Sequence, residues 1–268
     1  EEFNNSHYVV FATKNGTVKK TSLKEYSRPR ANGIKALNIA EGDEVVDVRL
    51  TNGKNELILA DRNGRAVRFD ESEIRDMGRN ATGVRGMVLD KDDAVVGMIV
   101  VNDPVKENVM VVSENGYGKR SAIEDYRKTS RAKKGVKTIA ITEKTGKLVA
   151  IKNVTDENDL MIINKSGIVI RMAVADVRVV GRATQGVRLI NLSKKNDVIA
   201  SVCKVMSSEL EATVEEESRA QWNETNEKLD KDINSQSASS AADSADVDSN
   251  LPEDETNSET SDDENITE

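Results

Sequence analysis

The sequence predicts an all-β fold, a propeller-like array of four similar blades, and three observations support this prediction. Four apolar runs each lead into an Asn-Gly or Ser-Gly turn, the type of turn that favours a short β-hairpin. These turn glycines recur 48, 52 and 51 residues apart, at Gly16, Gly64, Gly116 and Gly167. A second glycine follows each after 17 to 19 residues, at Gly33, Gly83, Gly135 and Gly186. Repeats of this length built from short strands are typical of propellers.

Each repeat is expected to contain four short strands. In the second repeat, one strand leads into Gly64, a second leaves it over Arg65–Phe69, and a third follows the second glycine over Val84–Leu89. The fourth strand is an aliphatic run, at Glu44–Leu50, Ala94–Val101, Leu148–Val154 and Val198–Val205. The repeats therefore cover about 8–50, 56–101, 108–154 and 159–205. A β-sandwich is the alternative, but it does not require so regular a period.

Helix is expected only as single turns in the connections, near Ser72–Met77 and Ala122–Tyr126. The one cysteine, Cys203, lies in an apolar run and is expected to be a small core residue. It cannot form a disulfide within the chain, which favours a reducing cytoplasm. No apolar run approaches the roughly 18 residues that span a bilayer. The chain begins without Met or a basic leader, so we expect a fragment of a longer protein with no signal peptide.

The charge divides the chain into a basic body, residues 1–206, and an acidic tail, residues 207–268. The tail has 20 acidic and 3 basic side chains, a net charge of -17, which leaves 36 basic and 27 acidic side chains and a net charge of +9 in the body. The tail has too few apolar residues to offset the entropy of ordering, so it is expected to be disordered. A basic domain joined to an acidic tail is typical of a protein that binds polyanions.

Within the body, cations recur at three positions of the repeat: four residues after the turn glycine, four before the second glycine and two after it. Further cations lie beside these positions. The candidate DNA-binding residues are Lys19, Lys20, Arg30, Lys35, Arg65, Arg68, Arg79, Arg85, Lys119, Arg120, Arg131, Lys133, Lys134, Lys137, Arg171, Arg182 and Arg188. One lysine or arginine alone is usually part of a solvated face, but a repeated set predicts a basic track for a bent phosphate backbone.

The second glycine of each repeat would let another backbone approach closely, and its plainer use is a tight bend or bulge. Aromatic residues make up only 3% of the chain, which argues against a platform that stacks single-stranded bases. Duplex DNA is therefore the expected partner.

Several of these segments together closely resemble the C-terminal domain of the DNA gyrase A protein. The resemblance covers essentially all of residues 1–206 and depends on Asn15–Lys20, Thr82–Gly86, Asn115–Arg120, Ser130–Gly135 and Val180–Gly186. It implies a β-pinwheel, a propeller variant whose blades exchange strands, with DNA wrapped around a basic rim to support negative supercoiling. It also implies partners, namely the rest of gyrase A together with gyrase B in an A2B2 enzyme, and an acidic tail that modulates wrapping.

The chain departs from that family pattern in two ways. Family domains usually have six blades, whereas four are visible, and their first blade carries a Gln-Arg-Arg-Gly-Gly type of box that is absent from this sequence. We therefore expect the chain to begin after the first two blades. The corresponding domain of a topoisomerase IV stays open as an alternative, and so does a propeller that binds acidic proteins.

No catalytic residue is expected in this chain, although the resemblance implies that it is part of an ATP-dependent type IIA topoisomerase. That family cleaves DNA with a tyrosine beside an arginine, and none of the four tyrosines follows an arginine. A Gly-x-x-x-x-Gly-Lys phosphate loop is also missing from the sequence. His7 is the only histidine, so no histidine-based triad or zinc site is expected. ATP and Mg²⁺ would act elsewhere in the holoenzyme.

Overall fold

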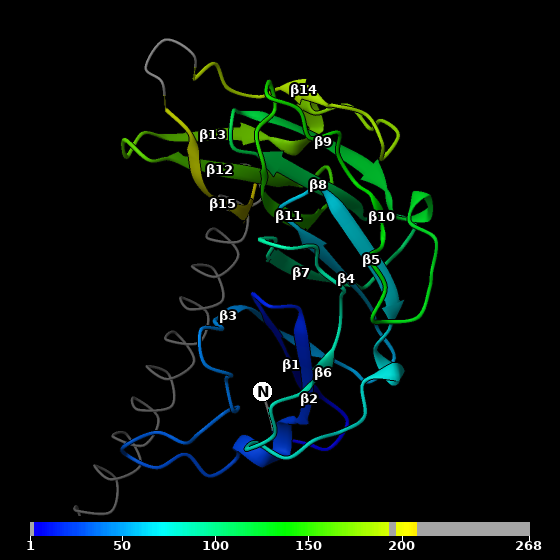
Figure 1. The fold of residues 1–268 in the computed structure, drawn as a ribbon, viewed down its shortest axis with the longest axis vertical. Helices are drawn as coiled ribbons and strands as arrows, with labels where there is room; N and C mark the ends of the chain where they lie inside the picture. The colour runs from blue at the N-terminus through cyan, green and yellow to red at the C-terminus, as the bar shows by residue number, and fades with distance from the viewer. Residues whose placement is uncertain (1–2, 193–196, 208–268) are drawn as a thin grey trace, which may run out of the picture. The chain divides into compact units, whose positions relative to one another are not determined.

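A computed structural model describes residues 3–192 and 197–207, and it confirms the all-β prediction. These residues form four small antiparallel sheets in a propeller-like arrangement (Figure 1). The acidic tail, apart from Ser207, lies outside the described residues. None of the described helices is long and apolar enough to cross a membrane.

The strands agree closely with the expected positions. The first repeat forms β1 (Tyr8–Thr13), β2 (Thr17–Ser22) and β3 (Val45–Thr51). The second forms β4 (Glu56–Asp61), β5 (Arg65–Asp70), β6 (Val84–Arg85) and β7 (Val95–Val101). The third forms β8 (Asn108–Ser113), β9 (Tyr117–Ala122), β10 (Val136–Lys137) and β11 (Leu148–Val154). The fourth forms β12 (Asn158–Asn164), β13 (Val169–Ala173), β14 (Val187–Arg188) and β15 (Ile199–Met206).

A short 3-10 turn follows the second strand of every repeat. These turns are η1 (Leu23–Tyr26), η2 (Glu71–Glu73), η3 (Ile123–Asp125) and η4 (Val174–Asp176). Two of them, η2 and η3, lie where the sequence predicted a single helical turn. In the second, third and fourth repeats, this turn redirects the chain from the sheet of its own repeat toward the sheet of the preceding one.

In the second, third and fourth repeats, the third strand is only two residues long and pairs with the sheet of the preceding repeat. The sheet orders are β3-β1-β2-β6, β10-β5-β4-β7, β11-β8-β9-β14 and β13-β12-β15. Thus β6 pairs with β2, β10 with β5 and β14 with β9. The expected strand Val84–Leu89 is therefore shorter than predicted. Neighbouring blades exchange strands, as the family resemblance implied.

The two ends of the array follow from this exchange. The segment around Gly33 occupies the donor position of the first repeat, but the described chain has no preceding sheet and the segment forms no strand. The last sheet has three strands because no following repeat among the described residues supplies a fourth. Four strands per repeat is accordingly correct only for the repeats after the first.

The second glycines of the second, third and fourth repeats are needed because the neighbouring backbone lies against them. A Cβ at Gly83 would lie 2.5 Å from the Val18 carbonyl oxygen, and one at Gly186 would lie 2.5 Å from the Gly118 carbonyl oxygen. At Gly135 it would overlap the Ala66 carbonyl. The backbone that approaches these glycines therefore belongs to the preceding blade.

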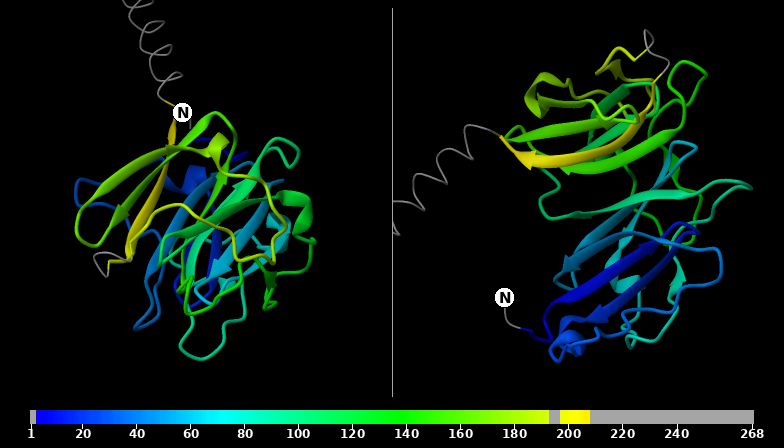
Figure 2. Two further views of the ribbon diagram at one scale, coloured as in Figure 1. Left: turned by 90° about the horizontal axis from the view of Figure 1, so that it is seen from above. Right: turned by 90° about the vertical axis from the view of Figure 1, so that its left-hand side faces the viewer.

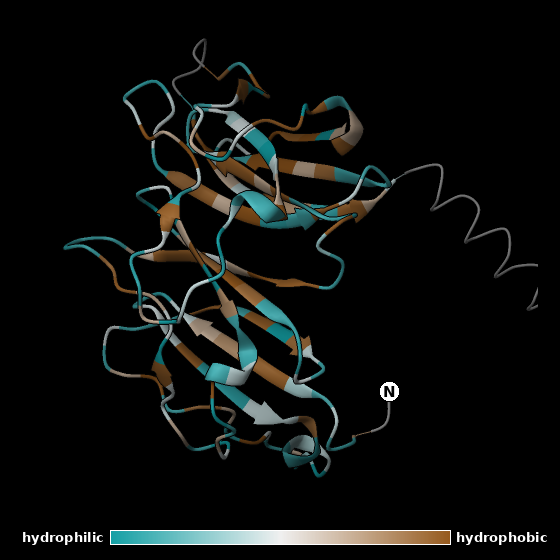
Figure 3. Ribbon diagram, turned by 90° about the vertical axis from the view of Figure 1, so that its right-hand side faces the viewer, coloured by the Kyte–Doolittle hydropathy of each residue, from teal (hydrophilic) through white to brown (hydrophobic). Residues whose placement is uncertain are grey.

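Three hydrophobic cores lie between the four sheets. Along β4, Leu57 and Leu59 belong to the first core, whereas Ile58 belongs to the second. Alternate strand residues point to opposite faces of a sheet, so both faces of this sheet are covered by a core. This is why the residues of β4 are apolar almost throughout. Figure 3 shows the hydrophobic residues concentrated on the strands and many of the connections hydrophilic.

The outer faces of the terminal sheets have no such cover within the described chain. Val48 and Leu50 of β3 are 44% and 41% exposed. In β15, Val202 is buried, whereas Cys203 on the opposite face is exposed. The expectation that Cys203 is a core residue is wrong, because its strand belongs to the last sheet.

We predict that Gly135→Ala destabilises the protein more than Gly33→Ala. Both glycines have nearly the same left-handed backbone, with φ of 78° and 77°, so alanine costs a similar ~1–2 kcal/mol of conformational strain at each site. A Cβ at Gly33 has nothing within 4 Å. The overlap with the Ala66 carbonyl should add roughly 1–3 kcal/mol for Gly135→Ala. Urea unfolding of the two variants measures the difference, and equal losses would contradict the close-approach explanation.

Candidate nucleic-acid interface

The cations four residues after the turn glycines hold neighbouring blades together. Arg68 donates from Nη1 to the carbonyls of Ile123 and Tyr126, at 2.9 and 3.0 Å, in the turn of the next repeat. Its Nε also donates to Glu56 Oε2 at 2.6 Å. Arg120 is buried and donates in the same way to the Val177 carbonyl and to Asp156. These guanidinium groups are occupied by protein acceptors.

The other two members of this set show the same behaviour with local differences. Lys20 is buried, lies 3.1 Å from Asp76 and donates to the Glu71 carbonyl. Arg171 belongs to the last repeat, and it donates instead to Asp159 and to the Met206 carbonyl, both at 2.8 Å. For Lys20, Arg68 and Arg120, the regular spacing therefore has a structural cause, the contact with the 3-10 turn region of the next repeat. Arg171 keeps the position but binds acceptors of its own repeat.

Lys19 and Lys119 are fully buried between blades. Lys19 Nζ donates to the carbonyls of Ala36 and Arg79, and Lys119 Nζ donates to the Gly181 carbonyl at 2.8 Å. Burial is the main cause that lowers the pKa of each lysine to about 8, and a nearby arginine lowers it further. Neither ammonium group reaches the solvent from this position.

The arginines four residues before the second glycines bridge a turn and a donated strand. Arg131 donates to the carbonyls of Glu73 and Arg85, at 3.1 and 2.9 Å. Arg182 repeats this geometry one blade later with Asp125 and Lys137, at 2.9 and 2.8 Å. These half-buried side chains fix the loop that precedes each donated strand. Arg79 makes the one corresponding bond to the Lys35 carbonyl at 3.3 Å.

The cations two residues after the second glycines are all exposed. They are Lys35, Arg85, Lys137 and Arg188. Three of them lie on β6, β10 and β14, and each of these strands is at the edge of its sheet. Among residues 3–192 and 197–207, none of the four has a carboxylate within ion-pair distance. Arg188 donates to the Tyr117 hydroxyl at 2.9 Å and lies over that ring.

A second set of exposed cations was not predicted from the sequence. Three exposed arginines each come directly after the C-cap residue of a 3-10 turn. They are Arg75, Arg127 and Arg178. Each stands eleven residues after its turn glycine, so the repeat spacing contained the signal. In the first repeat that position is Ser27, with Arg28 next to it. We call these three arginines, together with Lys35, Arg85, Lys137 and Arg188, the outer rim.

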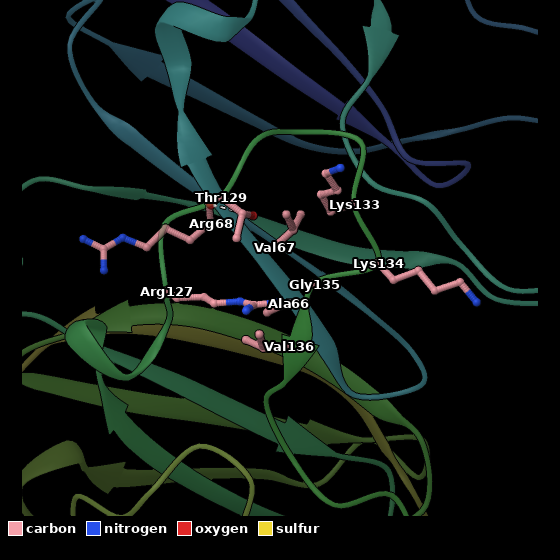
Figure 4. Close-up of a pocket in the computed structure, with 9 residues that line it drawn as sticks. All are labelled: Ala66, Val67, Arg68, Arg127, Thr129, Lys133, Lys134, Gly135 and Val136. Atoms are coloured by element: carbon pink, nitrogen blue, oxygen red, sulfur yellow. Dashed lines mark hydrogen bonds between the residues drawn. The ribbon is translucent and has the colours of Figure 1, made fainter.

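A basic pocket of about 410 Å³ lies where β5 receives the strand of the third repeat (Figure 4). Arg127 lies across it toward Ala66, while Arg68 and Lys134 point away in opposite directions. Lys133 lies on the loop above, and Lys134 pairs with Asp90. The pocket lining thus combines the exposed guanidinium of Arg127 with the exposed Lys133, and such cations bind anionic oxygens.

The seventeen candidates therefore divide into three groups. Lys19, Lys20, Lys119 and Arg120 are buried. Arg68, Arg79, Arg131 and Arg182 are half-buried and bind neighbouring carbonyls. The exposed candidates are Arg30, Lys35, Arg65, Arg85, Lys133, Lys134, Lys137, Arg171 and Arg188. The exposed group presents the charge that a ligand can reach, and the other two groups position it.

Comparison with known proteins agrees with this architecture. A family model described as "DNA gyrase C-terminal domain, beta-propeller" matches residues 7–52, 55–102, 107–155 and 158–203. The DNA gyrase A protein of Staphylococcus aureus strain MRSA252 is 40% identical over 245 residues, which cover 91% of this chain and 28% of the relative. The gyrase A protein of strain NCTC 8325 is 44% identical over 211 residues, 79% of this chain and 24% of the relative.

Solved structures show the same fold. The C-terminal domain of a DNA topoisomerase IV has a TM-score of 0.73 and 31% identity, covering 81% of this chain and 68% of that domain. A DNA gyrase A C-terminal domain has a TM-score of 0.68 and 22% identity, covering 76% of this chain and 68% of that domain. The chain spans about a quarter of the length of the curated relatives it matches.

Proposed function

The chain belongs to the DNA gyrase C-terminal domain family, and we propose that its outer rim binds duplex DNA without sequence preference and bends the duplex around successive blades. The observation that carries this proposal is the exposed cation two residues after each second glycine. Lys35, Arg85, Lys137 and Arg188 recur once per repeat, and no described carboxylate neutralises them. A series of such charges on consecutive blades matches a phosphate backbone that follows the array.

The chemistry of the rim favours phosphate over base recognition. Lysine and arginine bind phosphate oxygens of any sequence, and each neutralised phosphate releases condensed counterions. Base readout in the major groove usually requires a helix or a two-stranded ribbon that enters the groove. The described helices are 3-10 turns of three or four residues, which are too short for that role.

We further propose that the parent protein is gyrase A, where this wrapping would support negative supercoiling in an A2B2 complex with gyrase B in the bacterial cytoplasm. The curated gyrase A proteins of Staphylococcus aureus are 40–44% identical to this chain, which supports this assignment. Among the solved domains, the topoisomerase IV domain at 31% identity is more similar than the gyrase A domain at 22%. Cleavage, ATP hydrolysis and Mg²⁺ binding would belong to other parts of that enzyme. Supercoiling by the parent enzyme with and without this domain tests the assignment, and equal supercoiling would contradict it.

Binding should depend steeply on salt. If about six exposed cations contact phosphate, a plot of log K against log salt concentration should slope near about -5. The double variant Arg85→Glu/Lys137→Glu should bind more weakly with a flatter slope. The matched control Lys54→Glu/Lys106→Glu changes net charge equally at exposed lysines outside the rim. Fluorescence anisotropy with unrelated duplexes of equal length measures both properties, and equal losses in both double variants would refute the rim assignment.

Removal of residues 207–268 should strengthen DNA binding, most clearly at low salt. The tail carries -17 and is tethered to a body of +9, so it competes with phosphate at high effective concentration. The same titration with the complete chain and with residues 1–206 measures this effect. Circular dichroism of both chains provides the folding control. Identical affinities for the two chains would assign the tail another role.

Bending should depend on the rim more strongly than binding of a short duplex does. Bending a few tens of base pairs costs several kcal/mol, which only contacts spread along the path can offset. Energy transfer between dyes at the ends of a duplex of about 40 base pairs, long enough to bend appreciably, should rise on binding. It should rise less with Arg85→Glu/Lys137→Glu.

Arg85 and Lys137 suit the bending test better than Arg120 and Arg131. The latter two hold neighbouring blades together, so their replacement would also disturb the fold. A short duplex, which contacts few blades, should lose less affinity than the long one in the same variant. If the ends of the long duplex stay as far apart as in free DNA, the wrapping mechanism is wrong for this chain.

A further inference from the structure

The innermost strands of the four sheets enclose a hollow on the side opposite the donated strands. β3, β7, β11 and β15 are edge strands, and β3 contacts β7, β7 contacts β11 and β11 contacts β15. A hollow of about 390 Å³ lies among these strands. It is lined by Arg49, Leu50, Val100, Asn102, Lys152, Asn153, Cys203 and Lys204. Figure 2, right, views the sheets from the side of β15.

Three of the lining residues are cations, and they come from three different repeats. Arg49 and Lys152 share one position of the repeat, because they pair with Val10 and Met110, each six residues before its turn glycine. Lys204 pairs with Leu160, seven residues before Gly167, so it lies one residue beyond that position, which Cys203 occupies in the last repeat. The second repeat has Ile99 at this position. Three different blades therefore direct a positive charge to one hollow, although no requirement of the fold demands a cation there, as Ile99 shows.

The charges in this hollow are incompletely balanced. Arg49 pairs with Asp47 at 3.1 Å. Glu107 accepts hydrogen bonds from the Asn102 backbone and the Asn153 amide, both at 3.0 Å. Over the part of the chain that the structure describes, Lys152 and Lys204 have no carboxylate within ion-pair distance. Partial desolvation lowers the pKa of Lys204, Glu107 raises it, and Arg49 and Lys152 lower it further.

We propose that this axial hollow is an anion site that takes a compact phosphate-type polyanion, held by the ammonium groups of Lys152 and Lys204 and by the outer edge of the Arg49 guanidinium. The volume lies near the lower end of the range for small-ligand sites. No aromatic ring lines the hollow, so nothing is present to stack a nucleobase. A bound polyanion would join strands from three repeats and stabilise the blades against one another.

Cys203 gives a local measurement of occupancy. It is the only cysteine, it is exposed, and it lines the hollow. Pyrophosphate, added at constant ionic strength to the full chain in the presence of EDTA, should slow labelling of Cys203 by a maleimide. Saturable protection of at least about three-fold is expected, because an anion both covers the thiol and disfavours the reactive thiolate.

Two variants make the test specific. Lys152→Gln/Lys204→Gln should abolish protection, whereas the rim variant Lys35→Gln/Lys137→Gln should retain it. Sulfate at equal ionic strength measures the general effect of salt. No protection of the wild type, equal protection in the hollow variant, or an equal effect of sulfate would each overturn the proposal. DNA binding by Lys152→Gln/Lys204→Gln should stay at the wild-type level, so failure here leaves the rim proposal to its own tests.

Discussion

The structure depends on one close contact, the approach of the second glycine to the backbone of the preceding blade in the second, third and fourth repeats. At Gly83 and Gly186 the space for a Cβ is taken by a carbonyl oxygen. This contact lets a two-residue strand complete the neighbouring sheet, and it fixes the distance between consecutive blades. The exposed cation two residues later therefore recurs in a defined place on each blade. The same contact that joins the blades also spaces the charges of the outer rim.

The sequence was sufficient for the strands and for the repeat, because both leave a periodic signal. Alternating cores require a continuous apolar run such as Leu57–Ala60, and the turns require glycine. Periodicity was insufficient for strand exchange, since a donated strand and a retained strand have the same pattern. Only the family resemblance implied it. For the same reason, the spacing alone could not tell whether Gly135 faces DNA or the Ala66 carbonyl.

For the cations as well, the repeat spacing could not tell which side chains are buried and which are exposed. Arg120 and Lys137 recur equally well in the sequence, yet one is buried against backbone carbonyls and the other is exposed. A buried guanidinium must find acceptors, and the 3-10 turn of the next repeat supplies them. That turn is a long-range partner, so no local pattern reveals it. Arg75, Arg127 and Arg178 were missed for the opposite reason, because their regular spacing was present but unused.

Lys19 and Lys119, which are fully buried, are not required by the blade fold. At the position of Lys19 and Lys119, the second and fourth repeats have Val67 and Ile170. A lowered lysine pKa means that folding disfavours the charged form, so these lysines reduce the free energy of unfolding at neutral pH. That cost disappears as the pH rises from the folded value of about 8 toward 10.5, the unperturbed value. The hydrogen bonds to Arg79 and Gly181 carbonyls offset part of it. Blades with and without the charge fold alike, so the blade architecture depends on the glycine contact and the apolar cores, and charge is distributed over it position by position.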